Sequence, residues 1–563
     1  MYCTVKFMKK MKFQNVLFLY LILFSFYANA QNMAEYTDSW EGKIENPKVF
    51  NLKVEIENLG LEKATFKIYN SANIIDYTFN STNAYQLNIS FAENLVFKGI
   101  LSKDGKEING FIKSGFLLYH LKLTKSKNNF FVGDWNILMV DELKSPDFYL
   151  SVENGDNNEY QAYPIFGDNR FTGTWCDNFQ KEKDVISFSD FKTGLQFKGK
   201  LMPNKIQLGI YLGNNIITEI DLKKSTTDWK IGGFKTNATT SILKLNELEN
   251  LILKDSLPNT HSVLISRKGK LIYENYFDGY NANISHDMRS ASKSISSAIV
   301  GIAKDKLLFK SVEESIFDFL PTKYQSLKDS LKTKINLESL LTMSSGLDAI
   351  DYGINANPKS PAVEDNYQKS KDWIETILSA PMINKPNTKA NYGSANPYLL
   401  GIAMDSVVSG SLEQFIDENL FQKLEISNYI MFSDLNGNPY FGGGMYLTSK
   451  DMLKFGELYL NEGKWKTKRI LSKEWVKKSF KDYRALENTK DKNGYGYLWW
   501  HNTYQVKGES IESIEARGAG GQYIFVIPRL ETVVVITSGN YRNGKTQQPE
   551  MILEKYILPY FKN

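Results

Sequence analysis

The sequence predicts a multidomain protein, with an all-β module in its N-terminal half and an α/β domain in its C-terminal half. Three observations support this prediction. The chain has 563 residues, more than one ordinary domain holds. Short alternating segments separated by turn residues fill residues 31–225, whereas helical spacing follows residue 241. The content of 42% hydrophobic and 23% charged residues is typical of a globular protein with a substantial core.

The first 30 residues have the features of a secretory signal peptide. Four lysines precede an apolar run over residues 16–27, and Ala28-Asn29-Ala30 is a small-x-small cleavage site. The run is shorter than the about 20 apolar residues that a membrane span needs. We therefore expect cleavage after Ala30, a secreted or periplasmic protein and no stable membrane span; an uncleaved N-terminal anchor is the alternative. Cleavage leaves 64 basic residues (68 minus four) against 63 acidic ones, so no nucleic-acid partner is expected.

Residues 31–225 are predicted to form a β-rich module of two repeats, barrel-like or a sandwich. The segment LVFKGIL at 95–101 returns as LQFKGKL at 195–201, and each copy continues through a polar turn into further strands. This indicates two antiparallel meanders, about 31–127 and about 128–225. The module has no catalytic pattern, and we expect His120 at its surface or rim. Substrate capture, binding of cell-wall material and spacing all stay open as roles.

A linker and a second domain follow the β module. Residues 226–240 are rich in Ser, Thr, Gly and Asn and are predicted to be the linker. In the second domain, 241–563, residues 242–254 have helical spacing and residues 262–274 form a hairpin across a glycine-containing turn. Another helix is expected to begin near Ser290 and to run to about Leu307.

The start of that helix carries a candidate nucleophile and its base. Ser290 and Lys293 are three residues apart, so on a helix the amine can reach the hydroxyl. Serine needs a base to take its proton, and a desolvated lysine can serve as one. The spacing alone is weak evidence, because it recurs at Ser189–Lys192 and Ser241–Lys244 without any other sign of chemistry.

Two more motifs follow in the order of a known family. Residues 391–396 read NYGSAN and residues 519–521 read AGG. With RSASKS at 289–294, the chain from about residue 260 resembles the β-lactamase-related serine hydrolases, which include class C β-lactamases, DD-peptidases, esterases and 6-aminohexanoate-dimer hydrolase. The resemblance implies one antiparallel sheet, formed by the hairpin and the terminal strands, with a helical lobe and the active site where the two meet.

The resemblance also assigns roles to individual residues. It implies that Ser290 is the nucleophile and that Lys293 and Tyr392 handle its proton. The backbone N–H groups of Ser290 and Gln522 would form the oxyanion hole. Ser394, Gly520 and Gly521 would contact the substrate.

The third motif departs from the family pattern at one position. β-Lactamases have a basic residue there that contacts the substrate carboxylate, whereas this chain has Ala519. We therefore expect an amide, peptide or ester substrate, small or peptidic, rather than β-lactam resistance. Two alternatives stay open: β-lactamase or DD-carboxypeptidase activity, and an inactive binding protein with this fold. No cofactor is expected, and the four histidines have no metal-ligand spacing, so no metal site is expected either.

Overall fold

The computed structural model describes residues 36–81, 85–92, 94–128, 130–140, 142–154, 159–167, 176–226 and 242–561. The predicted signal peptide (1–30) and residues 227–240 of the predicted linker lie outside these ranges. By its internal contacts the chain separates into two units. The first comprises residues 1–51, 70–74 and 141–231, and the second comprises residues 52–69, 75–140 and 232–563.

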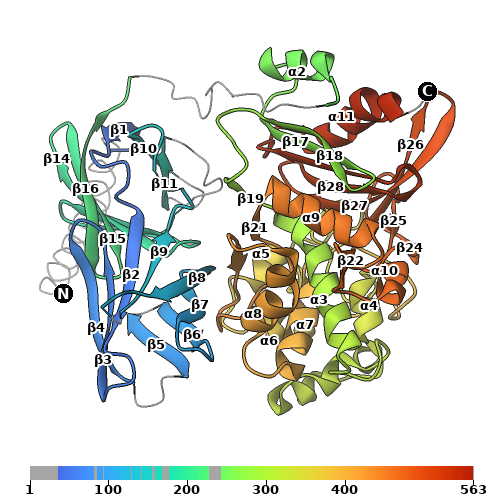
Figure 1. Ribbon diagram of the computed structural model, residues 1–563, viewed down its shortest axis with the longest axis horizontal. Helices are drawn as coiled ribbons and strands as arrows, with labels where there is room; N and C mark the ends of the chain where they lie inside the picture. Colours follow the sequence, from blue (N-terminus) through green and yellow to red (C-terminus); the bar gives the residue numbers. More distant parts are fainter. Residues whose placement is uncertain are drawn as a thin grey trace, which may run out of the picture. The chain divides into compact units, whose positions relative to one another are not determined.

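The first unit is a closed antiparallel barrel. Strand β1 pairs with both β10 and β16 and so closes the barrel, although β2–β9 separate it from β10 in the chain. Side chains alternate along the strands as the sequence pattern predicts, and Ile206, Leu208, Ile210 and Leu212 of β15 are fully buried. The barrel strands are β1 (Ser39–Lys43), β10 (Asp147–Asn154), β11 (Tyr160–Phe166), β12 (Cys176–Glu182), β13 (Val185–Asp190), β14 (Leu195–Met202), β15 (Lys205–Leu212) and β16 (Asn215–Lys224) (Figure 1).

The second unit begins with an antiparallel sheet. The repeated segment forms the meander β6-β7-β8 here and β14-β15-β16 in the barrel, as predicted from the repeat. The predicted all-β N-terminal region is thereby confirmed. The strands are β2 (Asn51–Glu57), β3 (Lys63–Tyr69), β4 (Asn73–Asn80), β5 (Gln86–Ala92), β6 (Leu95–Leu101), β7 (Glu107–Ser114), β8 (Leu117–Lys125) and β9 (Phe131–Asn136).

The second unit also contains the predicted α/β domain, with an eight-stranded antiparallel sheet. The hairpin β17–β18 forms one edge and joins the chain's last strands, in the order β18-β17-β29-β28-β27-β26-β25-β24. The family-derived expectation for this sheet is confirmed. Its strands are β17 (Thr260–Arg267), β18 (Lys270–Tyr276), β24 (Arg484–Ala485), β25 (Gly494–Tyr495), β26 (Trp500–Val506), β27 (Glu509–Gly518), β28 (Gln522–Ile527) and β29 (Thr532–Ser538).

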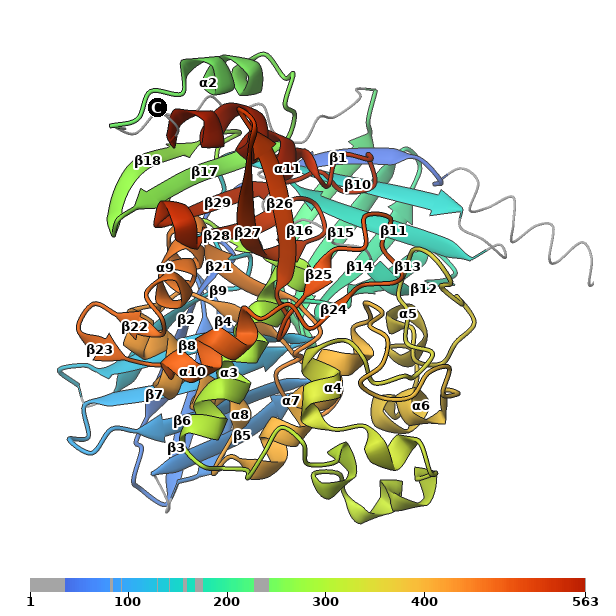
Figure 2. The same ribbon diagram turned by 90° about the vertical axis from the view of Figure 1, so that its right-hand side faces the viewer.

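Helices cover both faces of this sheet. On one face α9 (Ser449–Leu460) packs so closely that a Cβ at its Gly456 would lie 2.5 Å from Val533. Thr448 caps α9 by accepting a hydrogen bond from the backbone N–H of Asp451 at 3.1 Å. On the other face α2 (Asn246–Leu253) and α11 (Gln548–Ile552) bury apolar residues against the sheet (Figure 2).

A helical lobe lies between β19 (Ser285–Asp287) and β20 (Ile430–Phe432) in the chain. Its members are η2 (Arg289–Ser292), α3 (Lys293–Asp305), α4 (Leu337–Leu341), α5 (Glu364–Tyr367), α6 (Trp373–Ser379), α7 (Ala395–Val407) and α8 (Leu412–Ile416); α10 (Lys473–Ser479) follows later. Within the described ranges no single helix is long and apolar enough to cross a membrane. Within the same ranges, α7 and residues 412–424 are long and apolar enough only when they are taken together, and the two segments are bent by 93° relative to each other.

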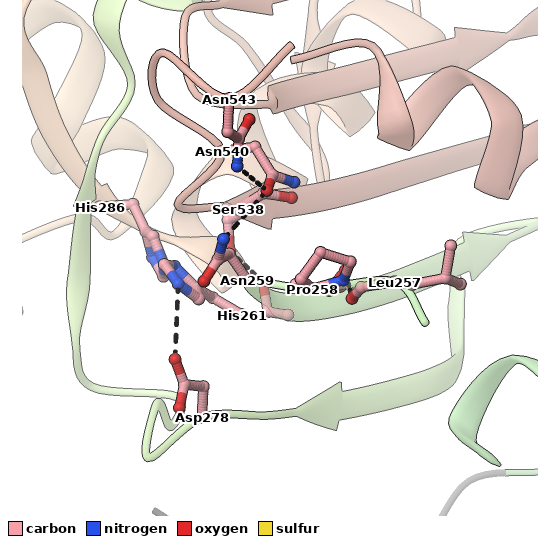
Figure 3. A network of polar contacts seen from close by, with 12 residues as sticks. Leu257, Pro258, Asn259, His261, Asp278, His286, Ser538, Asn540 and Asn543 are labelled. Atoms are coloured by element: carbon pink, nitrogen blue, oxygen red, sulfur yellow. Dashed lines mark hydrogen bonds and ion pairs between the residues drawn. The ribbon is translucent and has the colours of Figure 1, made fainter. Parts of the chain in front are cut away.

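A buried histidine pair lies at the end of β17 (Figure 3). His261 Nδ1 is 3.1 Å from His286 Nε2, the ring of Tyr280 stacks on both imidazoles, and Asp278 lies 4.0 Å from His261 Nε2. Both histidines are buried. Desolvation lowers the pKa of His261 to about 3 and that of His286 well below its ordinary value, so both rings stay neutral in the fold at neutral pH.

This pair makes a pH-dependent contribution to stability. Below the ordinary histidine pKa of 6.5 the unfolded chain binds protons that the native pair does not, so stability falls as the pH falls from 6.5 towards 3. Each histidine contributes up to about 1.4 kcal/mol per pH unit in that window. We expect the urea midpoint of His261→Gln to decrease less between pH 7 and pH 5 than that of the wild type. Parallel pH profiles for the two proteins would contradict this assignment.

Candidate active site

The candidate nucleophile, Ser290, lies in a turn with a strained residue before it. Arg289 has a φ of 49°, a left-handed conformation that costs on the order of 1–3 kcal/mol in a non-glycine residue. Two hydrogen bonds hold it there: its N–H donates to Asp287 Oδ1 at 3.0 Å, and its carbonyl accepts from the N–H of Gly444 at 3.2 Å. Ser290 therefore projects from a fixed turn between β19 and α3.

Lys293 is the centre of the site. Its Nζ donates to Ser290 Oγ at 2.9 Å, to Ser394 Oγ at 3.2 Å and to the carbonyl of Gly442. The predicted pairing of Ser290 with Lys293 across one helical turn is present. The side chain of Lys293 is only 1% exposed, so these three acceptors replace its hydration shell.

Tyr392 completes the predicted group. Its ring lies beside the amine, with Lys293 Nζ 5.1 Å from the ring centroid, and the neighbouring side chain of Ser290 lowers the pKa of its phenol, against the effect of burial. A bond from its backbone N–H to Asn488 Oδ1, 2.8 Å long, fixes the loop. The structure thus brings Ser290, Lys293, Tyr392 and Ser394 together, although Tyr392 and Ser394 come about 100 positions after Ser290.

Burial sets the protonation preferences of the two candidate bases. Desolvation lowers the pKa of the Lys293 amine, and the charges of Glu364 and Asp351 oppose it. Desolvation raises the pKa of Tyr392 above its ordinary value. Burial therefore shifts Lys293 towards the free amine and Tyr392 towards the protonated phenol, which are the states suited to a base and a proton donor.

Two carboxyl groups beside Lys293 were not predicted from the sequence. Asp351 Oδ2 accepts from the Oγ and from the N–H of Ser394, both at 2.7 Å, and its Oδ1 accepts from the N–H of Glu364 at 3.1 Å. Tyr440 donates its hydroxyl proton to Glu364 Oε1 at 2.5 Å. Burial raises the pKa of both carboxyl groups. No local motif marks these two acids.

The third motif packs directly on the nucleophile turn. Gly518 lies so close that a Cβ there would be 2.1 Å from the carbonyl oxygen of Met288. The strand β28 begins at Gln522, whose buried side chain donates to the carbonyl of Ser538. This packing places the backbone of Gln522 near Ser290, but its role in an oxyanion hole stays a prediction.

The turn between β27 and β28 contains the other predicted substrate contacts. Gly520 and Gly521 have φ values of 80° and 89°, which glycine adopts without strain. A Cβ at Gly520 would lie 2.4 Å from the ring of Tyr541, so no larger residue fits there. Ala519 is exposed at the tip of the turn, where a basic side chain would have room. Whether these residues contact a substrate stays a prediction.

Aromatic side chains surround the Tyr392 phenol. Its ring lies 5.1 Å from Trp500, 5.6 Å from Tyr352 and 6.2 Å from Tyr495, measured between centroids. Tyr352 is 49% exposed, and the other two are buried. Among the described residues, no group of three or more His, Cys, Asp or Glu side chains is placed to hold a metal ion.

Comparisons with known proteins find similar chains over about half of the sequence. A curated 6-aminohexanoate-dimer hydrolase from Paenarthrobacter ureafaciens is 20% identical over 286 residues, which cover 49% of this chain and 71% of that protein. Among solved structures, EstCE1, a hydrolase with promiscuous acyltransferase activity, is 16% identical with a TM-score of 0.47, covering 56% of this chain and 97% of its own. The octameric penicillin-binding protein homologue from Pyrococcus abyssi is 20% identical with a TM-score of 0.42, covering 56% and 80%.

The family model named Beta-lactamase matches residues 260–551, just over half of the chain. The matched region contains all three predicted motifs, so the resemblance stated from the sequence is confirmed. The chain belongs to the Beta-lactamase family of serine hydrolases.

Proposed function

We propose that this protein is an exported hydrolase that cleaves an amide, peptide or ester bond through an acyl-enzyme on Ser290. The observation that carries the proposal is the 2.9 Å contact between Ser290 Oγ and the buried amine of Lys293. The signal-peptide features of residues 1–30 support export, and the name of the curated relative, a hydrolase, agrees with the reaction class.

The proposed reaction has two halves. Lys293 takes the proton of Ser290 as Oγ attacks the substrate carbonyl, and the backbone N–H groups of Ser290 and Gln522 stabilise the oxyanion. The tetrahedral intermediate then expels the amine or alcohol, which receives a proton through the phenol of Tyr392. Water attacks the acyl-enzyme in the second half, gives up its proton to the same groups and releases the acid with Ser290 restored.

Ala519 favours substrates that lack a carboxylate next to the scissile bond. A basic residue at this exposed position would pair with such a carboxylate, and alanine cannot. This favours amide or ester hydrolysis over β-lactamase or DD-carboxypeptidase activity. The intact contact between Ser290 and Lys293 disfavours the inactive binding protein, because a buried lysine costs stability that a binding role does not need.

The first prediction concerns the nucleophile. We expect a fluorophosphonate to add one adduct per chain, and Ser290→Ala to lower the labelling rate more than about 1,000-fold. Ser189→Ala is the matched control, because Ser189 has the same spacing to a lysine but lies on strand β13. Intact mass measures the adduct. A labelled Ser290→Ala protein, or a wild type that is folded and unlabelled, would refute the proposal.

The second prediction concerns the carboxyl groups beside Lys293. Their negative charges raise the lysine pKa, so removing one lowers it further and leaves more free amine at acid pH. We expect the acid limb of the pH–rate profile to move to lower pH by about 1 unit in Glu364→Gln, and in the same direction in Asp351→Asn. The control is Glu425→Gln, an exposed acid paired with Lys466. An unchanged or alkaline-shifted limb would show that the Lys293 amine is not the titrating base.

The third prediction concerns Ala519. Replacing it by lysine restores a cation for a substrate carboxylate, and an exposed ion pair contributes up to about 1 kcal/mol. We expect Ala519→Lys to raise the rate of acylation by benzylpenicillin about fivefold relative to a neutral ester. The uncharged control Ala519→Gln should leave this ratio unchanged. An equal gain in both variants would mean that charge at this position does not set the preference.

A further inference from the structure

The sheet that contains β2–β9, from the first half of the chain, also contains strands from the second half. Its order is β19-β21-β20-β8-β9-β2-β3-β4, so strands from the catalytic half continue it beyond β8. Strand β20 pairs with β8 on one side and with β21 (Met445–Thr448) on the other. The β8 register is Ile430 opposite Tyr119, Met431 opposite Leu118 and Phe432 opposite Leu117. Strands β8, β19, β20 and β21 all belong to the second unit.

Phe116, the residue directly before β8, makes further contacts with β20 and with the residue that follows it. The carbonyl of Phe116 accepts from the N–H of Ser433 at 2.7 Å and from its Oγ at 3.1 Å. The ring of Phe116 stacks on Phe432 with centroids 5.5 Å apart and on Trp373 at 6.2 Å. Phe116 therefore contacts both β20 and the helical lobe.

A second contact lies one residue further along β8 than Tyr119. His120, which we expected at the surface or rim of the β module, faces the catalytic half instead. Its Nδ1 is 2.9 Å from the carbonyl oxygen of Ser427, and its ring stacks on Tyr429 with centroids 4.9 Å apart. β8 is thus attached to the segment before β20 as well as to β20 itself.

The connection from β20 to β21 reaches the catalytic lysine. Tyr440 is tied to β20 by its N–H, which donates to the carbonyl of Phe432 at 2.7 Å, and its hydroxyl reaches Glu364. Gly442, whose carbonyl accepts from Lys293 Nζ, lies against the Tyr440 ring so closely that a Cβ would be 2.2 Å from Cζ. The position of this carbonyl therefore depends on β20 and Tyr440.

The same sheet also leads to the nucleophile. Strand β21 pairs with β19, placing Tyr446 opposite Asp287, and the N–H of Met288 donates to the carbonyl of Met445 at 2.8 Å. Ser290 follows two residues after Met288. Consecutive strands of one sheet thus connect β8 to the carbonyl that holds the amine and to the turn that presents the hydroxyl.

We propose that β8 and Phe116 are a positioning element of the catalytic site, which fixes β20 and thereby the Gly442 carbonyl on Lys293. The sheet that contains β8 then contributes to the rate of the chemical step, in addition to any role in capturing substrate. This inference rests on the proposed function of Ser290 and Lys293. Its physical basis is the steep dependence of proton transfer on geometry, since a displacement of about 1 Å can cost about 100-fold in rate.

The test compares two phenylalanines of the same sheet. Phe116→Ala removes the ring that contacts the catalytic half, and Phe91→Ala removes a ring that stacks on Phe66 within the sheet. We expect Phe116→Ala to lower kcat for an ester at least tenfold with KM changed less than twofold, and Phe116→Tyr to restore kcat. Fluorophosphonate titration counts the reactive serines, so that kcat refers to folded, active protein. Phe91→Ala should keep the wild-type kcat per active site.

The outcomes separate this inference from the proposed function. A wild type without fluorophosphonate adduct would refute the function itself. A labelled wild type with an unchanged kcat per active site in Phe116→Ala would overturn the positioning role, as would an equal loss in Phe91→Ala. If Phe116→Ala does not fold, Phe116→Leu decides: a loss of at least threefold in kcat at constant KM supports the role, and a wild-type kcat overturns it.

Discussion

The buried amine of Lys293 is the constraint on which the rest of this site depends. Removing an ammonium group from water is costly unless acceptors replace its hydration, and here Ser290, Ser394 and the Gly442 carbonyl do so. The same burial lowers the pKa of the amine, which increases the fraction of unprotonated amine that can accept the proton of Ser290. Stability and reactivity are therefore opposed at this residue, and the surrounding structure has to hold the amine in place.

Segments far apart in the chain meet that requirement together. The nucleophile and lysine come from the turn after β19, Ser394 from the start of α7, and the carbonyl from the β20–β21 connection. Asp351 orients Ser394 through two hydrogen bonds, and Tyr440 links Glu364 to β20. Ser290 and Lys293 belong to helical turns, and hydrogen bonds tie the connections that contain Ser394, Asp351 and Gly442 to Lys293 and to one another. Such fixed positions keep a catalytic geometry more accurately than mobile loops do. The pairing of β20 with β8 makes the sheet that contains β8 part of this framework.

The sequence predicted the parts of the site that have local patterns. Ser290 and Lys293 share one helical turn, and Tyr392 and Ser394 share a short motif; the spacing alone was weak evidence, but the order of the motifs resembled that of a known family and pointed to these residues. Asp351 and Glu364 were missed because their contacts join residues with no regular spacing, and Gly442 acts through a backbone carbonyl that any residue possesses. The β8–β20 pairing was missed for a different reason: Ile430–Phe432 has only three residues, too few to show alternation. The β-rich character of the N-terminal region and the antiparallel sheet of the C-terminal domain were predictable. The pairing of strands from these two parts of the chain was not.

The central claim is that turnover passes through an acyl group on Ser290, with Lys293 as the base. The most direct measurement is rapid acid quench of the full-length protein during hydrolysis of a p-nitrophenyl ester, followed by peptide mass mapping. The account predicts an acyl mass on the peptide that contains Ser290, formed no more slowly than steady turnover, and no turnover in Ser290→Ala. Turnover that persists in Ser290→Ala at the wild-type rate, or an acyl group on a different residue, would contradict it.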